Sequence, residues 1–272
     1  MTAPDWLTGL IQTEINDAIS NDNRTTSTTF LGYPRDRVFT DIIMGGQADF
    51  DHPLPQWKLK AADVVLLYAK YNQGRHLDEL IHAFSSLLGP NQKITKPTIL
   101  DIGCGPFTGG LAFAAIQNSD EPFRYFGVDR SKAMIQLGES LAEAAKARGA
   151  FHPKTTFKFD TDLANFDFGP IRGEMTIVIA SYLLASPSLD VKSLVTSVSD
   201  ALARIGPGPC AILYTNSSRP EAREKFPSFK EALLRLGFKL VTEDIAPFHH
   251  TSKKVLDLHY ALLLRTEASI FL

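Results

Sequence analysis

A chain of 272 residues, 44% of them hydrophobic, can bury a complete core, either as one α/β domain with an extension or as two small domains. Its formal net charge of −2 provides no sequence-wide attraction to nucleic acid or to anionic membranes, which disfavours both as partners. Cys104 and Cys210 are too few for a disulfide framework, and no Cys/His spacing is typical of a zinc site, so we expect no metal.

The N-terminus does not have the pattern of a secretory signal. The first ten residues contain Asp5 and lack a basic segment before an apolar run. The longest nearly apolar stretch, residues 175–185, is too short to span a bilayer. We therefore expect a soluble, cytoplasmic protein that does not insert into a membrane.

The first third of the chain shows apolar residues at helical spacing. This pattern predicts a helix over 5–20, a polar loop over 21–30, irregular chain as far as Pro55, and two helices over 56–71 and 75–88. The last helix is followed by Gly89 and Pro90, which commonly end helices. We assign residues 1–96 to an N-terminal helical extension.

After Lys96 short apolar runs alternate with helical patterns. Strands are predicted over 98–102, 125–128, 156–159, 175–180, 211–215, 238–244 and 258–265, and helices over 109–118, 132–148, 192–205 and 229–236. Apolar strands separated by crossover helices form a parallel sheet covered on both faces. The last two strands lack a helix between them and are therefore expected to be antiparallel. The prediction for 97–272 is an α/β, doubly wound, mostly parallel seven-stranded sheet with a reversed strand near the C-terminus.

A glycine-containing turn follows the first of these strands, in the run TILDIGCGPFTGG over residues 98–110. Asp101 stands at the carboxyl end of the strand, and Gly103 and Gly105 allow a tight turn beneath a ligand. The helix that begins near Gly109 offers unpaired N–H groups. A glycine turn alone is also compatible with a loop that binds nothing.

A carboxylate at the tip of the second strand strengthens the ligand-binding interpretation. Asp129 follows residues 125–128 and is placed to accept hydrogen bonds from both hydroxyls of an adenosine ribose. Taken alone it would be a solvated helix cap. The run LDIGCGPFTGG together with the GVD that ends at Asp129 resembles the class I (Rossmann-like) S-adenosylmethionine-dependent methyltransferases, from Thr98 to the C-terminus. The reversed final strand also marks that fold.

The resemblance implies S-adenosylmethionine as the cofactor and a set of residues that bind it. They are Asp101, Gly103, Cys104 and Gly105 along the methionine portion, Asp129 at the ribose, Arg130 beside the adenine, Asp162 or its rival Asp160 at the adenine amino group, and Ser181 beside the transferable methyl.

Phe107 departs from the family pattern, because a glycine normally stands there. We expect this ring to narrow the methionine end of the site or to cover the cofactor. A nicotinamide enzyme is a weaker alternative, since Gly103, Gly105 and Gly109 are spaced G-x-G-x-x-x-G and not G-x-G-x-x-G.

The resemblance also implies that the extension folds over the cofactor as a lid and shapes the acceptor pocket. Tyr182, in the stretch beside the methyl, is the preferred acceptor-side residue, and His76 and His250 are candidate general bases. Alternatively, each histidine is a packing residue or a solvated residue without a catalytic role. Methyl transfer mainly requires a nucleophile held in line and freed of its proton.

The expected reaction is methyl transfer to an oxygen or nitrogen of a small-molecule acceptor. The Asn/Asp-Pro-Pro-Tyr signature of enzymes that methylate amino groups of adenine, cytosine or glutamine is absent, since Ala180 and Ser181 stand there. An RNA or protein methyltransferase is the alternative. It would be supported by one basic rim made of the residues Arg24, Arg35, Arg37, Lys58 and Lys60. A catalytically silent cofactor-binding scaffold, suggested by Phe107, is the alternative of another class.

Overall fold

The computed structural model describes residues 3–88, 94–117, 121–171, 173–248 and 256–266. None of the helices in these ranges combines the length and hydrophobicity that a bilayer crossing requires.

The centre of the molecule is a seven-stranded sheet with the order β5-β4-β3-β6-β7-β9-β8. Its strands are β3 (Thr98–Ile102), β4 (Arg124–Val128), β5 (Thr156–Asp160), β6 (Thr176–Ser181), β7 (Cys210–Ser217), β8 (Lys239–Phe248) and β9 (Leu256–Arg265). β9 runs antiparallel to both of its neighbours, and the pairs among β3 to β7 are parallel. The sheet with one reversed strand confirms the fold expected from the resemblance to class I methyltransferases.

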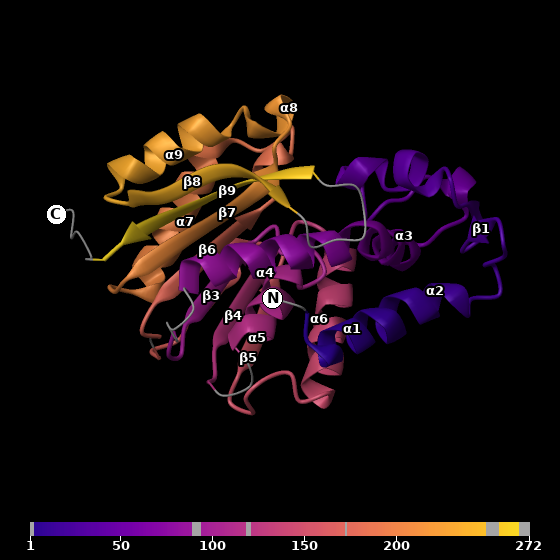
Figure 1. Cartoon of the computed structure of the whole chain (residues 1–272), viewed down its shortest axis with the longest axis horizontal. Helices are drawn as coiled ribbons and strands as arrows, with labels where there is room; N and C mark the ends of the chain where they lie inside the picture. Colours follow the sequence, from indigo (N-terminus) through magenta and orange to yellow (C-terminus); the bar gives the residue numbers. More distant parts are fainter. Residues whose placement is uncertain (1–2, 89–93, 118–120, 172, 249–255, 267–272) are drawn as a thin grey trace.

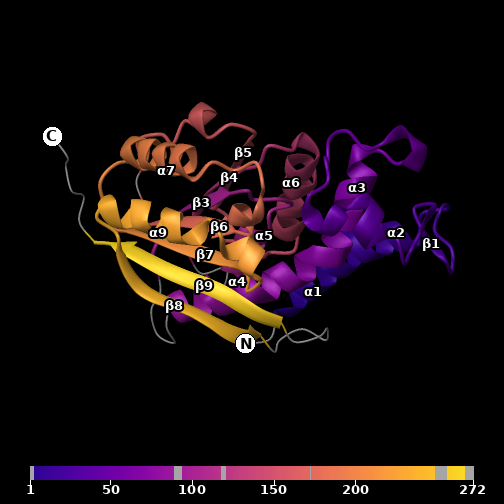
Figure 2. The same ribbon diagram turned by 90° about the horizontal axis from the view of Figure 1, so that it is seen from above.

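Helices cover both faces of the sheet (Figures 1 and 2). On one face lie α4 (Gly74–Leu88), α5 (Thr108–Gln117) and α6 (Lys132–Ala147), and on the other lie α7 (Val191–Ile205), α8 (Pro220–Arg223) and α9 (Phe226–Arg235). Two of these helices begin at side-chain caps, because Ser131 accepts from Met134 N and Asp190 accepts from Ser193 N. The doubly wound arrangement is therefore confirmed.

The extension begins with one continuous helical stretch formed by α1 (Asp5–Ile11), a π-helical segment (Gln12–Asp17) and α2 (Ala18–Ser20), as the periodicity predicts. The polar segment after it contains a short hairpin of β1 (Thr29–Phe30) and β2 (Tyr33–Pro34). Single turns follow at Val38–Ile42, Met44–Gly46 and Pro55–Trp57.

The next two predicted helices differ from the structure in their boundaries. The first, α3, spans Ala61–Tyr68 and not 56–71, because Lys58 adopts a left-handed conformation that ends the preceding turn. At its start Asp63 Oδ2 accepts a hydrogen bond from Lys60 N at 2.9 Å. α3 then continues through a π-helical segment (Ala69–Gln73) into α4, since Gly74 keeps right-handed helical angles.

The extension does not have a core of its own. Leu7, Leu10 and Ile15 belong to the same buried cluster as Ile99 of β3 and Phe113 of α5. The part of the extension from α2 to α3 lies beyond the carboxyl ends of the parallel strands, whereas α4 runs along one face of the sheet (Figure 1). A shared core of this kind holds the extension in place against the sheet edge where ligands bind in open α/β folds.

Phe107 lies in the core and not over the turn. The ring is 0% exposed and forms edge contacts with Tyr125, Phe157 and Phe159 at centroid distances of 4.7, 5.3 and 5.6 Å. Gly110 makes room for it, because a Cβ there would lie 2.0 Å from the ring. The expectation that Phe107 narrows or covers the cofactor site is wrong, since its left-handed backbone (φ 66°) directs the side chain into the sheet-facing core.

Phe107→Gly should destabilise the protein. Removing a buried Phe costs about 3–5 kcal/mol, and relief of the left-handed conformation returns about 1–2 kcal/mol. We expect a net loss of about 1–4 kcal/mol in the free energy of unfolding, measured with urea. Phe39→Ala, at a ring that is 45% exposed, is the control and should change stability much less. Unchanged stability of Phe107→Gly would contradict the core assignment.

Candidate functional site

The predicted site residues converge on one edge of the sheet. Asp101 and Asp129 stand at or just beyond the carboxyl ends of the adjacent parallel strands β3 and β4. Asp160 ends β5, and Ser181 ends β6, which flanks β3 on the other side. Because parallel strands share their carboxyl edge, four strand ends bring these side chains to one region.

The turn after β3 has the geometry that its glycines predict. Gly103 and Gly105 are left-handed, with φ of 72° and 51°. The N–H groups of Gly103 and Cys104 donate to the Val128 carbonyl at 2.8 and 3.0 Å, which fixes the turn against β4. A Cβ built on Gly105 would meet no atom of the described residues within 4 Å, so the turn is open there.

Asp101 and the side chain of Cys104 are buried beneath this turn. Asp101 is 2% exposed and accepts a hydrogen bond from the Tyr125 hydroxyl at 2.7 Å. Burial raises the pKa of Asp101 to about 7, although the hydrogen bonds from Tyr125 and Gly109 N–H oppose this. The Cys104 sulfur is enclosed as well, so this residue can face a ligand only through its main chain.

Asp129 joins the turn after β3 to the start of α6. Its Oδ2 accepts from Gly105 N at 3.0 Å and its Oδ1 from Ser131 N at 2.9 Å. Burial raises the pKa of Asp129 above its usual value. Each carboxylate oxygen keeps further acceptor capacity, which two neighbouring hydroxyl groups could use.

Asp51 of the extension also contacts the start of α6, and sequence reasoning missed it. Its carboxylate accepts from Ser131 Oγ at 3.1 Å, Lys132 N at 3.1 Å and Ala133 N at 2.9 Å. These bonds satisfy N–H groups at the helix start and tie the extension to the residues beside Asp129. Asp51 lies in an irregular segment 80 residues from Ser131, and no local pattern indicates this contact.

The residues predicted near an adenine lie at the ends of β4 and β5. Asp160 accepts from Asp162 N at 2.9 Å and Asn165 Nδ2 at 3.0 Å, which fixes the loop after β5. Asp162 is exposed and accepts from Ala164 N at 2.9 Å. Arg130 is exposed and donates to Ser188 Oγ at 3.3 Å.

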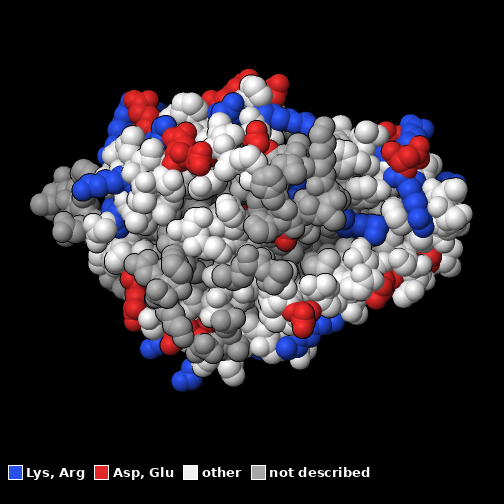
Figure 3. Space-filling view, viewed as in Figure 1, with Lys and Arg blue, Asp and Glu red and all other residues white. Residues whose placement is uncertain are grey.

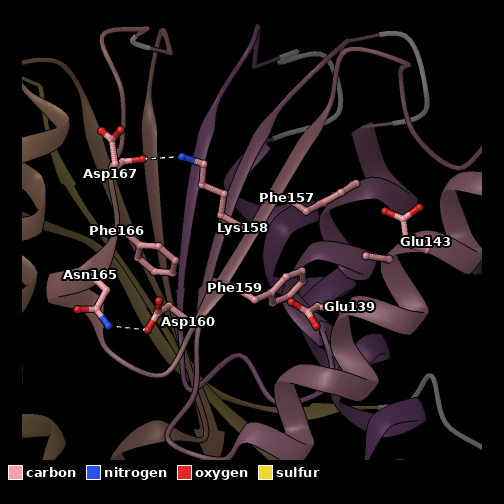
Figure 4. A pocket seen from close by; sticks show the side chains of 10 residues that line it. Glu139, Glu143, Phe157, Lys158, Phe159, Asp160, Asn165, Phe166 and Asp167 are labelled. Carbon is pink, nitrogen blue, oxygen red and sulfur yellow. Dashed lines mark hydrogen bonds between the residues drawn. The ribbon is translucent and has the colours of Figure 1, made fainter.

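A depression of about 510 Å³ lies beside the edge strand β5 (Figure 4). It is lined by Glu139, Ala142, Glu143, Phe157, Lys158, Phe159, Asp160, Asn165, Phe166 and Asp167. Of the predicted site residues it contains Asp160 alone, whose bond to Asn165 is visible there. This depression therefore borders the strand-end site and does not include the glycine turn.

Tyr182 and His76 are brought together by the fold. Their rings stack at a centroid distance of 4.1 Å and an angle of 22°. The Tyr182 hydroxyl donates to Glu79 Oε1 at 3.1 Å and accepts from Arg75 Nη2 at 3.1 Å. Ser181 Oγ accepts from Thr215 Oγ1 at 2.9 Å. His250 lies outside the described residues.

Burial is the main cause of the pKa shifts of His76, Glu79 and Tyr182. It lowers the pKa of His76 to about 3, with a further contribution from the positive charge of Arg75. His76 is therefore a neutral ring at pH 7, and this environment does not favour titration near neutrality. Burial also raises the pKa of Glu79 and that of Tyr182, which keeps the phenol protonated.

Arg24 and Arg37, two of the five basic residues considered for a rim, are neutralised by acids. Arg24 pairs with Asp22 and Asp63, each at 2.9 Å, and Arg37 pairs with Asp41. On the visible face of the molecule, acidic and basic side chains are interspersed (Figure 3).

No family model and no curated protein matches the sequence. Among solved structures, the chain is similar to magnesium protoporphyrin IX methyltransferase from Synechocystis PCC 6803 with bound SAM. The TM-score is 0.47 at 14% identity, covering 98% of this chain and 100% of that chain. A TehB-like SAM-dependent methyltransferase from Corynebacterium glutamicum has a TM-score of 0.41 at 18% identity, covering 71% of this chain and 87% of that chain.

TrmN from Thermus thermophilus is also similar, with a TM-score of 0.43 at 16% identity, covering 70% of this chain and 48% of that chain. The identities and TM-scores of these likenesses are low. The chemistry of the site therefore rests on the residues of this chain.

Asp101→Asn should reduce the pH dependence of stability. The folded protein holds the Asp101 proton up to about pH 7, whereas an unfolded chain releases it near the ordinary value of 3.8. Between these values the folded state binds more protons, so the free energy of unfolding falls as pH rises. Urea unfolding at a series of pH values should show a smaller decrease in the variant. Equal slopes would show that Asp101 is already ionised in the folded wild type.

Proposed function

We propose that this protein is an enzyme that binds S-adenosylmethionine and transfers its methyl group. The observation that carries this proposal is the Asp129 carboxylate, held by Gly105 N–H beside the open glycine turn, with acceptor capacity remaining on both oxygens. A ribose with two adjacent hydroxyls matches that carboxylate.

The other strand-end residues fit the rest of this cofactor. Gly103, Cys104 and Gly105 offer main-chain carbonyls to the methionine portion, because their N–H groups donate to Val128 and Asp129, and Asp101 lies beneath them. Arg130 and Asp162 flank the adenine, whereas Asp160 is occupied in holding the loop. Ser181 and Tyr182 lie beside the methyl. The cofactor supplies an electrophilic methyl carbon on a sulfonium.

The residues of the chain bind the cofactor and the acceptor, orient them, and exclude water from the site. The extension, tied down by Asp51, acts as a lid that shapes the acceptor pocket and keeps solvent from the strand ends. The protonated phenol of Tyr182 is held by Arg75 and Glu79 and orients the acceptor. Neutral His76 accepts a hydrogen bond from the attacking group and holds it in line.

The acceptor that we propose is a small molecule attacked at oxygen or nitrogen. This is supported by the net charge of −2 and by the acids that neutralise Arg24 and Arg37. An RNA or protein acceptor remains the alternative. The alternative of a catalytically silent scaffold was based on Phe107. This ring lies in the core and leaves the turn open, so it does not support that alternative.

Calorimetric titration with S-adenosylmethionine and S-adenosylhomocysteine tests the cofactor. We expect both to bind, and Asp129→Ala to weaken both, since each lost hydrogen bond to a charged group is worth about 1.5–3 kcal/mol. Asp36→Ala, at an exposed acid of the extension, is the matched control and should bind normally. Absence of binding to the wild type would overturn the proposal, and normal binding by Asp129→Ala would remove Asp129 from the site.

Transfer of a labelled methyl group tests the acceptor class. Incubation with cell extract and labelled cofactor should place the label in the low-molecular-weight fraction, and label in RNA or protein would contradict a small-molecule acceptor. Tyr182→Phe should lower the rate about tenfold or more through loss of one hydrogen bond. Its affinity for S-adenosylhomocysteine should stay the same, because the phenol is assigned to the acceptor.

A further inference from the structure

A buried ion pair in the first turns of α4 has unused binding capacity. Arg75 Nε donates to Glu79 Oε1 at 2.6 Å, and the two side chains are 25% and 1% exposed. Glu79 Oε2 has no hydrogen-bond partner among the described residues. A buried carboxylate oxygen without a donor is costly, so this oxygen is suited to accept a hydrogen bond from a ligand.

Two contacts join the segments around this pair to the glycine turn. Gln73, two residues before Arg75, donates from Nε2 to the Pro106 carbonyl at 2.9 Å. On the other side, Leu183 follows the tyrosine that both members of the pair contact, and it lies against Gly103, whose Cβ would be 3.1 Å from Leu183 Cδ1. The residue two positions before Arg75 and the residue after Tyr182 therefore both touch the turn that is assigned to the methionine portion of the cofactor.

Gln73, which contacts the turn at Pro106, also has an acceptor that is unpaired among the described residues. Its side chain is fully buried, and within the described part of the chain its Oε1 lacks a donor. Arg75 thus supplies a guanidinium that can bind a carboxylate, and Glu79 Oε2 is an unused oxygen that can bind an ammonium. An α-amino acid carries these two groups on one carbon.

We infer that Arg75 and Glu79 bind the amino acid end of S-adenosylmethionine, Arg75 at the carboxylate and Glu79 at the ammonium. This inference rests on the proposed function. It makes α4 of the extension part of the cofactor site. The alternative role for the pair is to bind the acceptor, in which case both residues would act on turnover and not on cofactor affinity.

Three ligands that share the 5′-methylthioadenosine core separate these roles. They are S-adenosylmethionine, decarboxylated S-adenosylmethionine, which keeps the amine, and 5′-methylthioadenosine, which lacks both groups, the chain on sulfur that carries them and the sulfonium charge. Arg75→Met should weaken binding of S-adenosylmethionine about tenfold or more and leave the other two affinities unchanged. Glu79→Gln should weaken both amine-bearing ligands and leave 5′-methylthioadenosine unchanged.

Arg37→Met is the control, because Arg37 belongs to the extension, is 63% exposed and lies in an ion pair with Asp41. It should bind all three ligands as the wild type does. If Arg75→Met does not fold, Arg75→Lys replaces it and should give a smaller loss confined to S-adenosylmethionine, since a lysine cannot form the bidentate contact.

The outcomes separate this inference from the proposed function. A wild type that binds none of the three ligands overturns the proposed function. A wild type that binds S-adenosylmethionine, with Arg75 variants equally affected or unaffected for all ligands, overturns the inference alone and assigns the pair to the acceptor or to the core.

Discussion

The Asp129 carboxylate receives the main-chain N–H groups of Gly105 and Ser131, and through them it joins the turn after β3 to the start of α6. Parallel pairing alone brings the ends of β3 and β4 to the same edge. The carboxylate then sets how the two turns face each other. The openness at Gly105 and the acceptor capacity of Asp129 both depend on this arrangement.

The extension completes the site from outside the sheet. Asp51 binds the start of α6, Gln73 binds the turn at Pro106, and Tyr182 is held between Arg75 and Glu79. All three contacts use buried or half-buried polar groups, which are stable only when they are paired. Since the extension shares its core with the sheet, packing brings these groups to the strand ends.

Burial of the ionised forms of the titratable groups in this site costs free energy. Burial raises the pKa of Asp101, Asp129 and Glu79 and lowers that of His76, so each is shifted toward its neutral form. Perturbed groups of this kind gather at functional sites, where a bound ligand can compensate the burial. The positive charge of a sulfonium cofactor would favour the ionised form of the nearby carboxyl groups.

Local patterns in the chain were sufficient for the strands of the main sheet, most helices, the sheet class and the strand-end residues. Apolar periodicity gives strands and helices their approximate limits, and the chain order of alternating elements puts Asp101, Asp129 and Ser181 at one edge. The boundaries at Lys58 and Gly74 were missed, because single backbone conformations decided them.

Contacts between segments far apart in the sequence determined the features of the site that local patterns did not predict. Tyr182 meets Glu79 across 103 residues and Arg75 across 107, and Asp51 meets Ser131 across 80. No local periodicity encodes such contacts, because they depend on how the extension docks on the sheet. Phe107 is the clearest case: its position in the turn was evident from the sequence, but the direction of its ring followed from a left-handed backbone and the space beside Gly110.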